Sequence, residues 1–314
     1  MSTHKLIARS KIYLPRGLYT LLPVFLAVPL LLGAARTDDP LFENPIASGE
    51  LTFLNNFAGR SSDKIIHDGK FRKLEQVFVP QVPIHFRVDD EPLAGTLENV
   101  LANVPLRVQV RDGRYVMAAS RGTPTLRGKG FVWVDTQEGI AMGGIFFFPR
   151  NGEPTPTLTV FSNQVVQESL AMSQFPPAFY EDLSNWGAAT GIPTVVTRYF
   201  INQEGEKVLL QHDEDYCSQA GGMPTQPQDF CEQLNADAAE IDMQAAYFLA
   251  STGYASNASA QMTMQQDQSV WIELRDSTCV AGPNLLPCRI RMTRERTGVL
   301  LKKRPVPVGP IKHK

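Results

Sequence analysis

The chain has 314 residues, of which 43% are hydrophobic and 20% charged, and it contains 23 Gly and 23 Pro. This composition is too apolar for a disordered protein and too rich in turn-forming residues for a coiled coil or a helical array. The length is about twice the ~150 residues of a typical domain, so we expect two domains, or one domain with extensions.

Residues 1–35 have the composition of a secretory signal peptide. They contain no acidic residue and four fixed positive charges, and an apolar run over residues 21–35 ends in Gly33-Ala34-Ala35. A run of about 15 residues is short for a membrane-spanning helix, which needs ~20, and small residues are what signal peptidase recognises. We therefore expect a periplasmic or secreted protein cleaved near Ala35. The alternative is an uncleaved N-terminal anchor, and membrane contact is expected only through this segment.

The rest of the chain is acidic. Without residues 1–35, 26 Lys and Arg stand against 32 Asp and Glu, which gives a net charge of −6. A basic tail over residues 302–314 contributes five positive charges, so residues 36–301 carry −11. A protein with this charge repels nucleic acid and attracts cationic partners. The alternative is that the acidic excess only keeps the protein in solution.

The four cysteines lie in the C-terminal third and are even in number: Cys217, Cys231, Cys279 and Cys288. Export makes disulfides the default state, whereas a zinc site would need closer cysteine pairs. Three connectivities are possible. Sequential pairing closes two short loops, and we expect the Cys279–Cys288 link most of all because eight residues separate the two cysteines.

Residues 36–62 show no sustained periodicity and are interpreted as a linker. An α+β domain or domain pair of unknown family is predicted over residues 63–216. It begins with a β-α-β-β unit: a strand at 84–88, a helix at 93–104 and a hairpin closed by Asp112-Gly113. Residues 84–118 resemble the short N-terminal domains of secretins and TonB-dependent receptors, a resemblance that bears on fold alone.

The following segment is rich in strands. β-branched and aromatic runs predict strands at 131–134, 144–148, 157–161, 195–201 and 207–210. Residues 177–190 predict a helix, with Pro177 at its start and Phe179, Leu183 and Trp186 on one stripe. The predicted fold class is α+β, a strand-rich N-terminal region followed by a small, disulfide-stapled three-helix C-terminal domain.

The C-terminal domain is predicted over residues 217–301. A first helix starts near Cys231 and ends near Gly253, a second spans residues 262–279, and a third starts around Cys288. In the second helix, Val270, Trp271 and Leu274 are expected to face inward. The two disulfides would offset the limited core of so small a unit.

The segments CEQLNADAAEIDMQAAY, WIELRDSTC and MTRERTGVL resemble, in this order, the helical domain of LprI-type lysozyme inhibitors. The resemblance covers residues 217–301, and its most specific residues are Trp271, Arg275, Asp276 and Cys279. It implies a protein that binds lysozyme or another cationic cell-wall hydrolase.

Two roles are open for the motif residues Trp271, Arg275 and Asp276. Trp271 and Arg275 are four residues apart, so a cation–π contact is available on one helical face. Asp276 is expected to brace the third helix through Arg294 or Arg291, and this structural role is preferred to partner contact. The expected contact residues are the acids of the first helix, Asp237, Glu240 and Asp242, which are taken as exposed and would attract a cationic surface. The alternative is that these acids are simply solvated.

No motif for a nucleophilic triad, a zinc protease, a P-loop or a dinucleotide fold is present, so no catalytic residue, metal or cofactor is predicted. The polar cluster at residues 212–215 is interpreted as a solvated strand exit, because alternate side chains of an extended chain point apart. A pair of carboxylates that cleaves a glycan is recognised by the distance between the two groups in space, so the sequence does not test for such a pair. The predicted function is an exported, lysozyme-inhibitor-like binding protein. The alternatives are an envelope adaptor whose α+β region recognises a protein or glycan, and an unrecognised envelope hydrolase.

Overall fold

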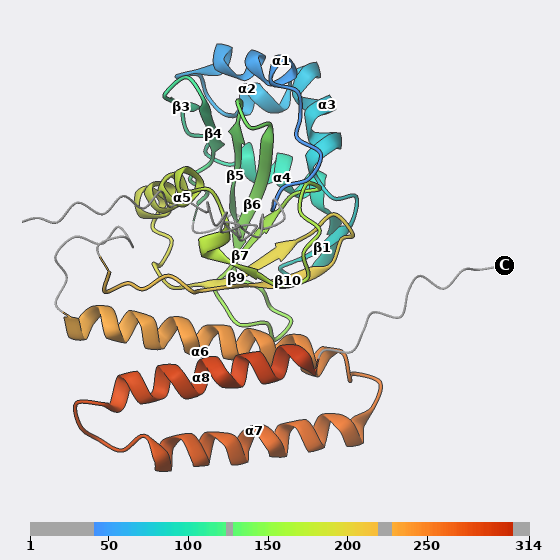
Figure 1. The fold of residues 1–314 in the computed structure, drawn as a ribbon. Coiled ribbons are helices and arrows are strands. Elements are labelled where there is room, and N and C mark those ends of the chain that lie inside the picture. The colour runs from blue at the N-terminus through green and yellow to red at the C-terminus, as the bar shows by residue number, and fades with distance from the viewer. Residues whose placement is uncertain (1–40, 124–127, 219–227, 304–314) are drawn as a thin grey trace, which may run out of the picture. The chain divides into compact units, whose positions relative to one another are not determined.

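The computed structural model describes residues 41–123, 128–218 and 228–303. The predicted signal peptide and residues 304–314 of the predicted basic tail lie outside these ranges. Within them the α+β class is confirmed: a strand-rich part is followed by three long helices (Figure 1). No helix in the described ranges is long and apolar enough to cross a membrane.

The central element is an eight-stranded sheet in the order β3-β4-β5-β6-β7-β9-β10-β8. Its strands are β3 (Gln109–Arg111), β4 (Tyr115–Ala119), β5 (Lys129–Asp135), β6 (Ile140–Phe147), β7 (Thr157–Phe161), β8 (Leu170–Ala171), β9 (Thr197–Ile201) and β10 (Lys207–Gln211). β3 to β7 pair antiparallel, whereas β7 pairs parallel with β9 and β10 parallel with β8. The strands predicted from the sequence are therefore present.

The β-α-β-β unit is not a separate domain. β1 (Pro83–Phe86) pairs with β2 (Asp89–Pro92) in a two-stranded sheet of its own, and α4 (Leu93–Leu101) follows. The hairpin β3–β4 instead extends the large sheet through β5. The unit is thus divided between two sheets.

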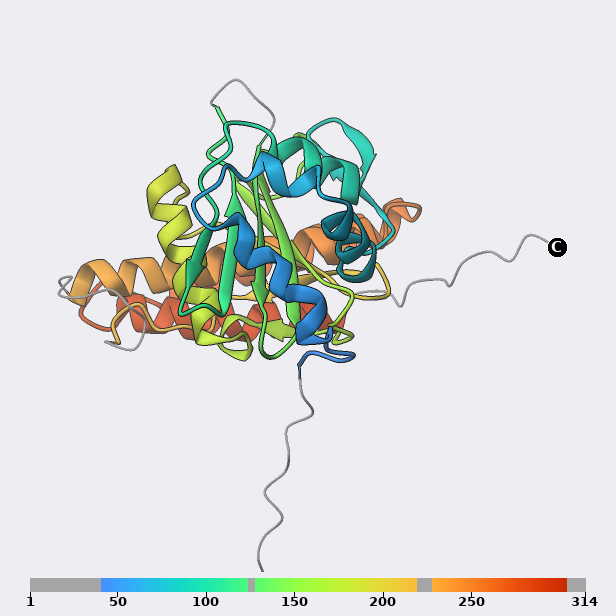
Figure 2. The same ribbon diagram turned by 90° about the horizontal axis from the view of Figure 1, so that it is seen from above.

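Both faces of the large sheet are covered, which explains why its strands read as continuous apolar runs. One face packs against the N-terminal helices α1 (Ser48–Leu51), η1 (Thr52–Phe57), α2 (Asp63–Ile66), α3 (Gly69–Phe78) and α4 (Figure 2). The other face packs against η2 (Met172–Gln174) and α5 (Pro177–Thr190). The predicted helix at 177–190 is confirmed, and Gly191 ends it at φ 71°.

The linker predicted at 36–62 is wrong for its second half. Leu51, Phe53, Leu54 and Phe57 are buried in the core that α1 to α4 share with the sheet. The helices are short and partly 3-10, so their apolar residues do not recur with the α-helical period.

Two adjacent glycines allow close packing of aromatic rings in the sheet. Gly144 lies opposite Phe131 on β5, and Gly143 lies opposite Phe161 on β7. A Cβ atom at either glycine would collide with the ring of its neighbour. The rings therefore cover the glycine backbone on opposite faces of β6.

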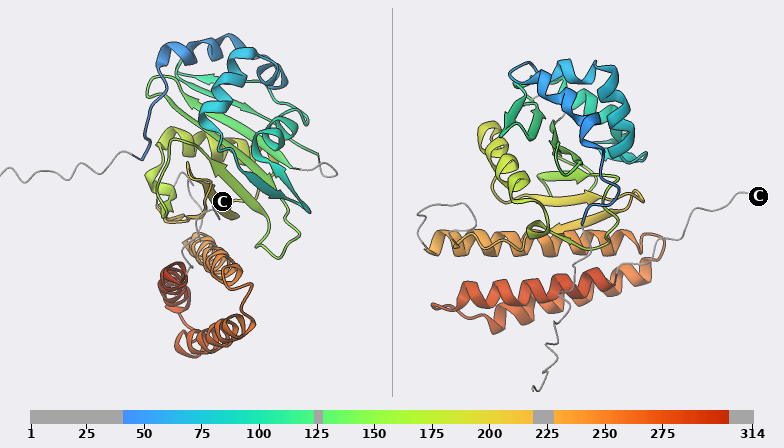
Figure 3. Two further views of the ribbon diagram at one scale, coloured as in Figure 1. Left: turned by 90° about the vertical axis from the view of Figure 1, so that its right-hand side faces the viewer. Right: turned by 45° about the horizontal axis from the view of Figure 1, so that its top comes forward.

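The C-terminal part consists of α6 (Gln228–Thr252), α7 (Ala258–Thr278) and α8 (Leu285–Lys302). α6 lies against β9, β10 and α8, whereas α7 lies on the far side of the helices from the sheet (Figures 1 and 3). Tyr199 and Leu209 of the sheet share a core with Met243, Ala246 and Leu249 of α6. One side of α6 is therefore occupied by the strand-rich part.

Candidate functional site

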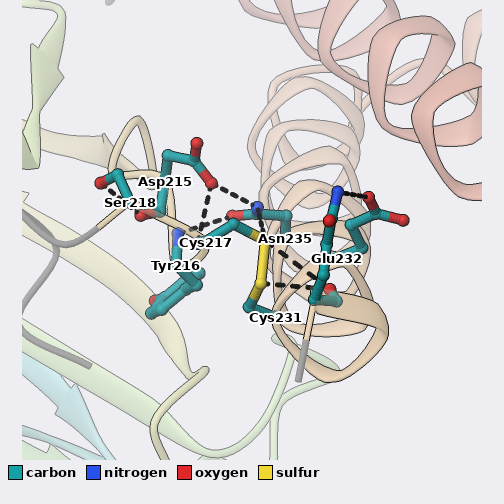
Figure 4. The surroundings of a disulfide bond; sticks show 8 residues. Asp215, Tyr216, Cys217, Ser218, Cys231, Glu232 and Asn235 are labelled. Carbon is teal, nitrogen blue, oxygen red and sulfur yellow. Dashed lines mark hydrogen bonds between the residues drawn. A yellow bond between two sulfur atoms is a disulfide. The ribbon is translucent and has the colours of Figure 1, made fainter. Parts of the chain in front are cut away.

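The first disulfide fixes the point where the chain passes from the sheet to α6. Cys217 and Cys231 are bonded, with their Cα atoms 5.0 Å apart. Figure 4 shows Asn235 beside this bond, where its amide donates to the Asp215 carboxylate at 2.8 Å and accepts from the Tyr216 backbone N–H at 3.1 Å. The disulfide and Asn235 together hold the first turns of α6 against the segment that follows β10.

The second disulfide joins the end of α7 to the first turn of α8. Cys279 and Cys288 are bonded, with Cα atoms 5.6 Å apart. The sequential pairing expected from the sequence is the one that the structure has. One bond thus ties α6 to the segment that follows β10, and the other ties α8 to the end of α7, whereas no disulfide joins α6 to α7.

The contacts of α7 with its neighbours are mainly polar. Its buried residues are Met264, Gln268 and Arg275. The Arg275 guanidinium donates to Glu240 of α6 at 2.8 Å and to Asp276 at 3.0 Å, and its side chain is only 5% exposed. α7 is thus attached to α6 by a buried cation.

Two guanidinium groups lie close to the ring of Trp271. The Cζ atom of Arg275 is 5.0 Å from the ring centroid, which is the contact that the i,i+4 spacing predicts. Arg296 of α8 approaches the same ring at 5.5 Å and also donates to Gln268 at 3.0 Å and to Asp267 at 2.9 Å. Hydrogen bonds from Lys303 and Arg296 hold the pKa of the Asp267 carboxyl below its ordinary value, although partial burial opposes this.

The expected brace from Asp276 to Arg294 or Arg291 is not present. Asp276 accepts from Arg275 on its own helix and lies 3.9 Å from Arg289, and its side chain is 53% exposed. Arg291 pairs with Glu295 on α8 instead. Arg275, rather than Asp276, is the buried member of the motif.

The three acids predicted as contact residues are in three different environments. Asp237 is exposed and bonds only Gln233 of its own helix, at 2.8 Å. Glu240 is half-buried and occupied by Arg275. Asp242, expected to be exposed, is buried, with 7% of its side chain accessible, because it points to the sheet and not to solvent.

Asp242 joins α6 to the end of β10. Its carboxylate accepts from the His212 backbone N–H at 2.8 Å and from the His212 Nδ1 at 2.7 Å. The imidazole is completely buried, and its Nε2 has no hydrogen-bond partner among the described residues. The contact connects residues 30 positions apart and ties the helical part to the strand-rich part.

The segment 212–215 is therefore only half solvated. Its side chains alternate as predicted, but His212 and Glu214 point inward, where Glu214 accepts from Arg198 at 2.5 Å. Burial opposes ionisation of Glu214, but Arg198 and His212 outweigh it and hold the pKa below the ordinary value. No group of three His, Cys, Asp or Glu suited to a metal ion occurs in the described ranges, this segment included.

Sequence reasoning also misjudged which face of α7 is buried. Val270 and Leu274, expected to point inward, are 64% and 56% exposed. Trp271, also expected to point inward, is half-buried against the core that α6 and α8 share. The buried residues Met264, Gln268 and Arg275 do follow a helical spacing, but two of them are polar, so an apolar pattern does not reveal them.

One comparison with known families matches this part of the chain. The family model described as "Lysozyme inhibitor LprI" matches residues 217–300, which include both disulfides, α6, α7 and all but the last two residues of α8. No curated protein and no solved structure is significantly similar to the chain. The strand-rich part is outside the match.

Proposed function

We propose that the protein is exported and that its C-terminal helical domain binds and inhibits a cationic, lysozyme-like cell-wall hydrolase. The observation that carries this proposal is the family match at residues 217–300. The match covers a domain with two disulfides, which suit an oxidising, extracytoplasmic compartment.

The charge of the protein supports a cationic partner. Residues 36–301 carry a net charge of −11, which draws a positively charged protein toward the surface at long range and raises the association rate. Among the three acids predicted as contacts, Asp237 is the one whose carboxylate is exposed and without an ion pair in the described residues. We therefore assign to Asp237, and not to Asp242, a part in this attraction.

A lysis assay tests the proposal. The oxidised protein without residues 1–35 is added to c-type lysozyme acting on a cell-wall suspension, and turbidity is followed over time. Lysis should slow in proportion to the amount of added protein, whereas undiminished lysis at a large molar excess would refute the function. Asp237→Lys should lower the association rate constant, with the effect fading as salt rises, because screening removes long-range attraction.

Export is tested separately. N-terminal sequencing of the envelope-associated protein should begin near Arg36. A protein that retains Met1 would contradict cleavage and favour an N-terminal anchor.

A further inference from the structure

α7 presents apolar side chains outward. Met262, Val270 and Leu274 are 61%, 64% and 56% exposed. With Gln266 they form one ridge along the helix, because residues four positions apart lie above one another. Three such residues on one ridge of a helix are unusual for a surface that faces only water.

Ion pairs with α6 and α8 fix the orientation of this ridge. Arg275 bonds Glu240, and Asp267 bonds Arg296, across the two interfaces with α6 and α8. Rolling α7 to bury the ridge would separate both pairs and leave the Arg296 guanidinium of α8, whose side chain is 7% exposed, without Asp267 and Gln268. Because unpaired buried charges are strongly unfavourable, the ridge stays on the surface.

One acid next to the ridge carries an unbalanced charge. Of the three acids of α7, Asp267 pairs with Arg296 and Lys303, and Asp276 pairs with Arg275 and lies 3.9 Å from Arg289, which leaves Glu273. Glu273 lies beside Val270 and Leu274 on the outer side and has no ion pair in the described residues. An apolar ridge next to unbalanced acid fits a partner that is both apolar and cationic.

The same charges disfavour two other occupants. An anionic membrane surface would be attracted instead to α8, which exposes Arg291, Arg294 and Lys302. A second α7 packed ridge to ridge would bring the Glu273 carboxylates of both copies together, which is unfavourable without a cation between them.

We propose that the outer ridge of α7 is the docking surface for the cationic hydrolase, an inference that rests on the proposed function. Glu240 of α6 bonds Arg275 near the end of α7, so α6 lies next to α7 at this point. Asp237, the exposed acid of α6, lies one turn before Glu240. The acids steer the partner at long range, and Met262, Val270 and Leu274 make the short-range contact. The long-range attraction governs the association rate, and the short-range apolar contact governs the dissociation rate.

The test compares matched variants of the oxidised protein without residues 1–35. Val270→Gln with Leu274→Gln removes two of the three apolar side chains of the ridge but adds no charge and introduces a good helix former. The control is Val299→Gln, because Val299 is a 45% exposed apolar residue on α8 of the same domain. Binding of c-type lysozyme is measured by surface plasmon resonance, with circular dichroism to verify folding. The double variant should dissociate at least tenfold faster with little change in association, and the control should behave like the wild type.

Each other outcome counts against the proposal in a different way. If the wild type binds lysozyme and the double variant dissociates at the same rate, the α7 docking surface is wrong and the proposed function stands. If the wild type does not bind lysozyme, the proposed function is refuted, and so is the proposal that a hydrolase docks on the ridge. A wild type that elutes as a dimer, or that sediments with anionic vesicles, and loses this in the double variant, would assign the ridge to self-association or to a membrane instead.

Discussion

The joint between α6 and the sheet gives the sharpest prediction about this fold. Asp242→Ala removes a carboxylate that accepts two hydrogen bonds, from the His212 backbone N–H at 2.8 Å and from the His212 Nδ1 at 2.7 Å. Both donors would remain buried without an acceptor. A hydrogen bond to a charged group contributes about 1.5 to 3 kcal/mol, so the free energy of unfolding should fall by about 3 to 5 kcal/mol.

Asp237→Ala is the matched control, because it removes an exposed Asp from the same helix. The gain in helix propensity is the same in both variants and cancels in their difference. The control should change stability by no more than about 0.5 kcal/mol. Asp242→Asn keeps an oxygen that can accept from the backbone N–H, so its loss should be about half that of the alanine variant.

Urea unfolding at neutral pH, followed by circular dichroism with the disulfides intact, measures these differences. Thermal unfolding is a second measurement. The melting temperature of Asp242→Ala should be lower than that of the wild type by roughly 6 to 20 °C, since about 2 to 4 °C corresponds to 1 kcal/mol in a protein of this size. If Asp242→Ala were within about 1 kcal/mol of Asp237→Ala, the carboxylate would not hold α6 on the sheet. A charge reversal at Asp242 is for the same reason unsuitable as a probe of partner binding.

Three further predictions concern stability. Replacing Cys279 and Cys288 by Ser opens a loop with a sequence separation of 9, which should cost about 2 to 3 kcal/mol in the chain-entropy model and is measured by urea unfolding. Burial and the neighbouring Glu98 raise the pKa of Glu75 from 4.5 to about 7, so the contribution of Glu75 to stability is fully present below pH 4.5 and is lost as pH rises through 7. Glu75→Gln should flatten this part of the pH profile, and an unchanged profile would contradict the assignment. Gly144→Ala should destabilise by about 2 kcal/mol or more because its methyl group meets the Phe131 ring, whereas Gly95→Ala, at an ordinary φ and with no atom within 4 Å of the added methyl group, serves as the control and should not destabilise.

The elements that could be predicted are those whose signal is local. β7 and α5 coincide with their predicted bounds because a buried strand is a continuous β-branched or aromatic run, and because Pro177 and Gly191 mark the ends of the helix. The disulfide pairing could be predicted for a similar reason, because each bond closes a short loop.

The errors concern contacts between residues that are distant in sequence. Asp242 is buried because His212 lies 30 residues earlier, and nothing near Asp242 on α6 indicates this partner. Arg275 and Gln268 face inward because Glu240 and Arg296 come from two other helices. An apolar pattern therefore assigned the wrong face of α7 to the core, since it cannot anticipate polar side chains that are buried with their partners.

The position of α6 also restricts where a partner can bind the helical domain. Its residues Met243, Ala246 and Leu249 share a core with the sheet, and Asp242 is bonded to the end of β10. This side of α6 would be accessible only if the joint opened, which costs the contacts that Asp242→Ala is predicted to remove. The surfaces that remain are the outer side of α6 at Asp237 and the outer ridge of α7. Because α8 exposes cations, a cationic hydrolase that binds this domain should approach from the side where α6 and α7 present their acids.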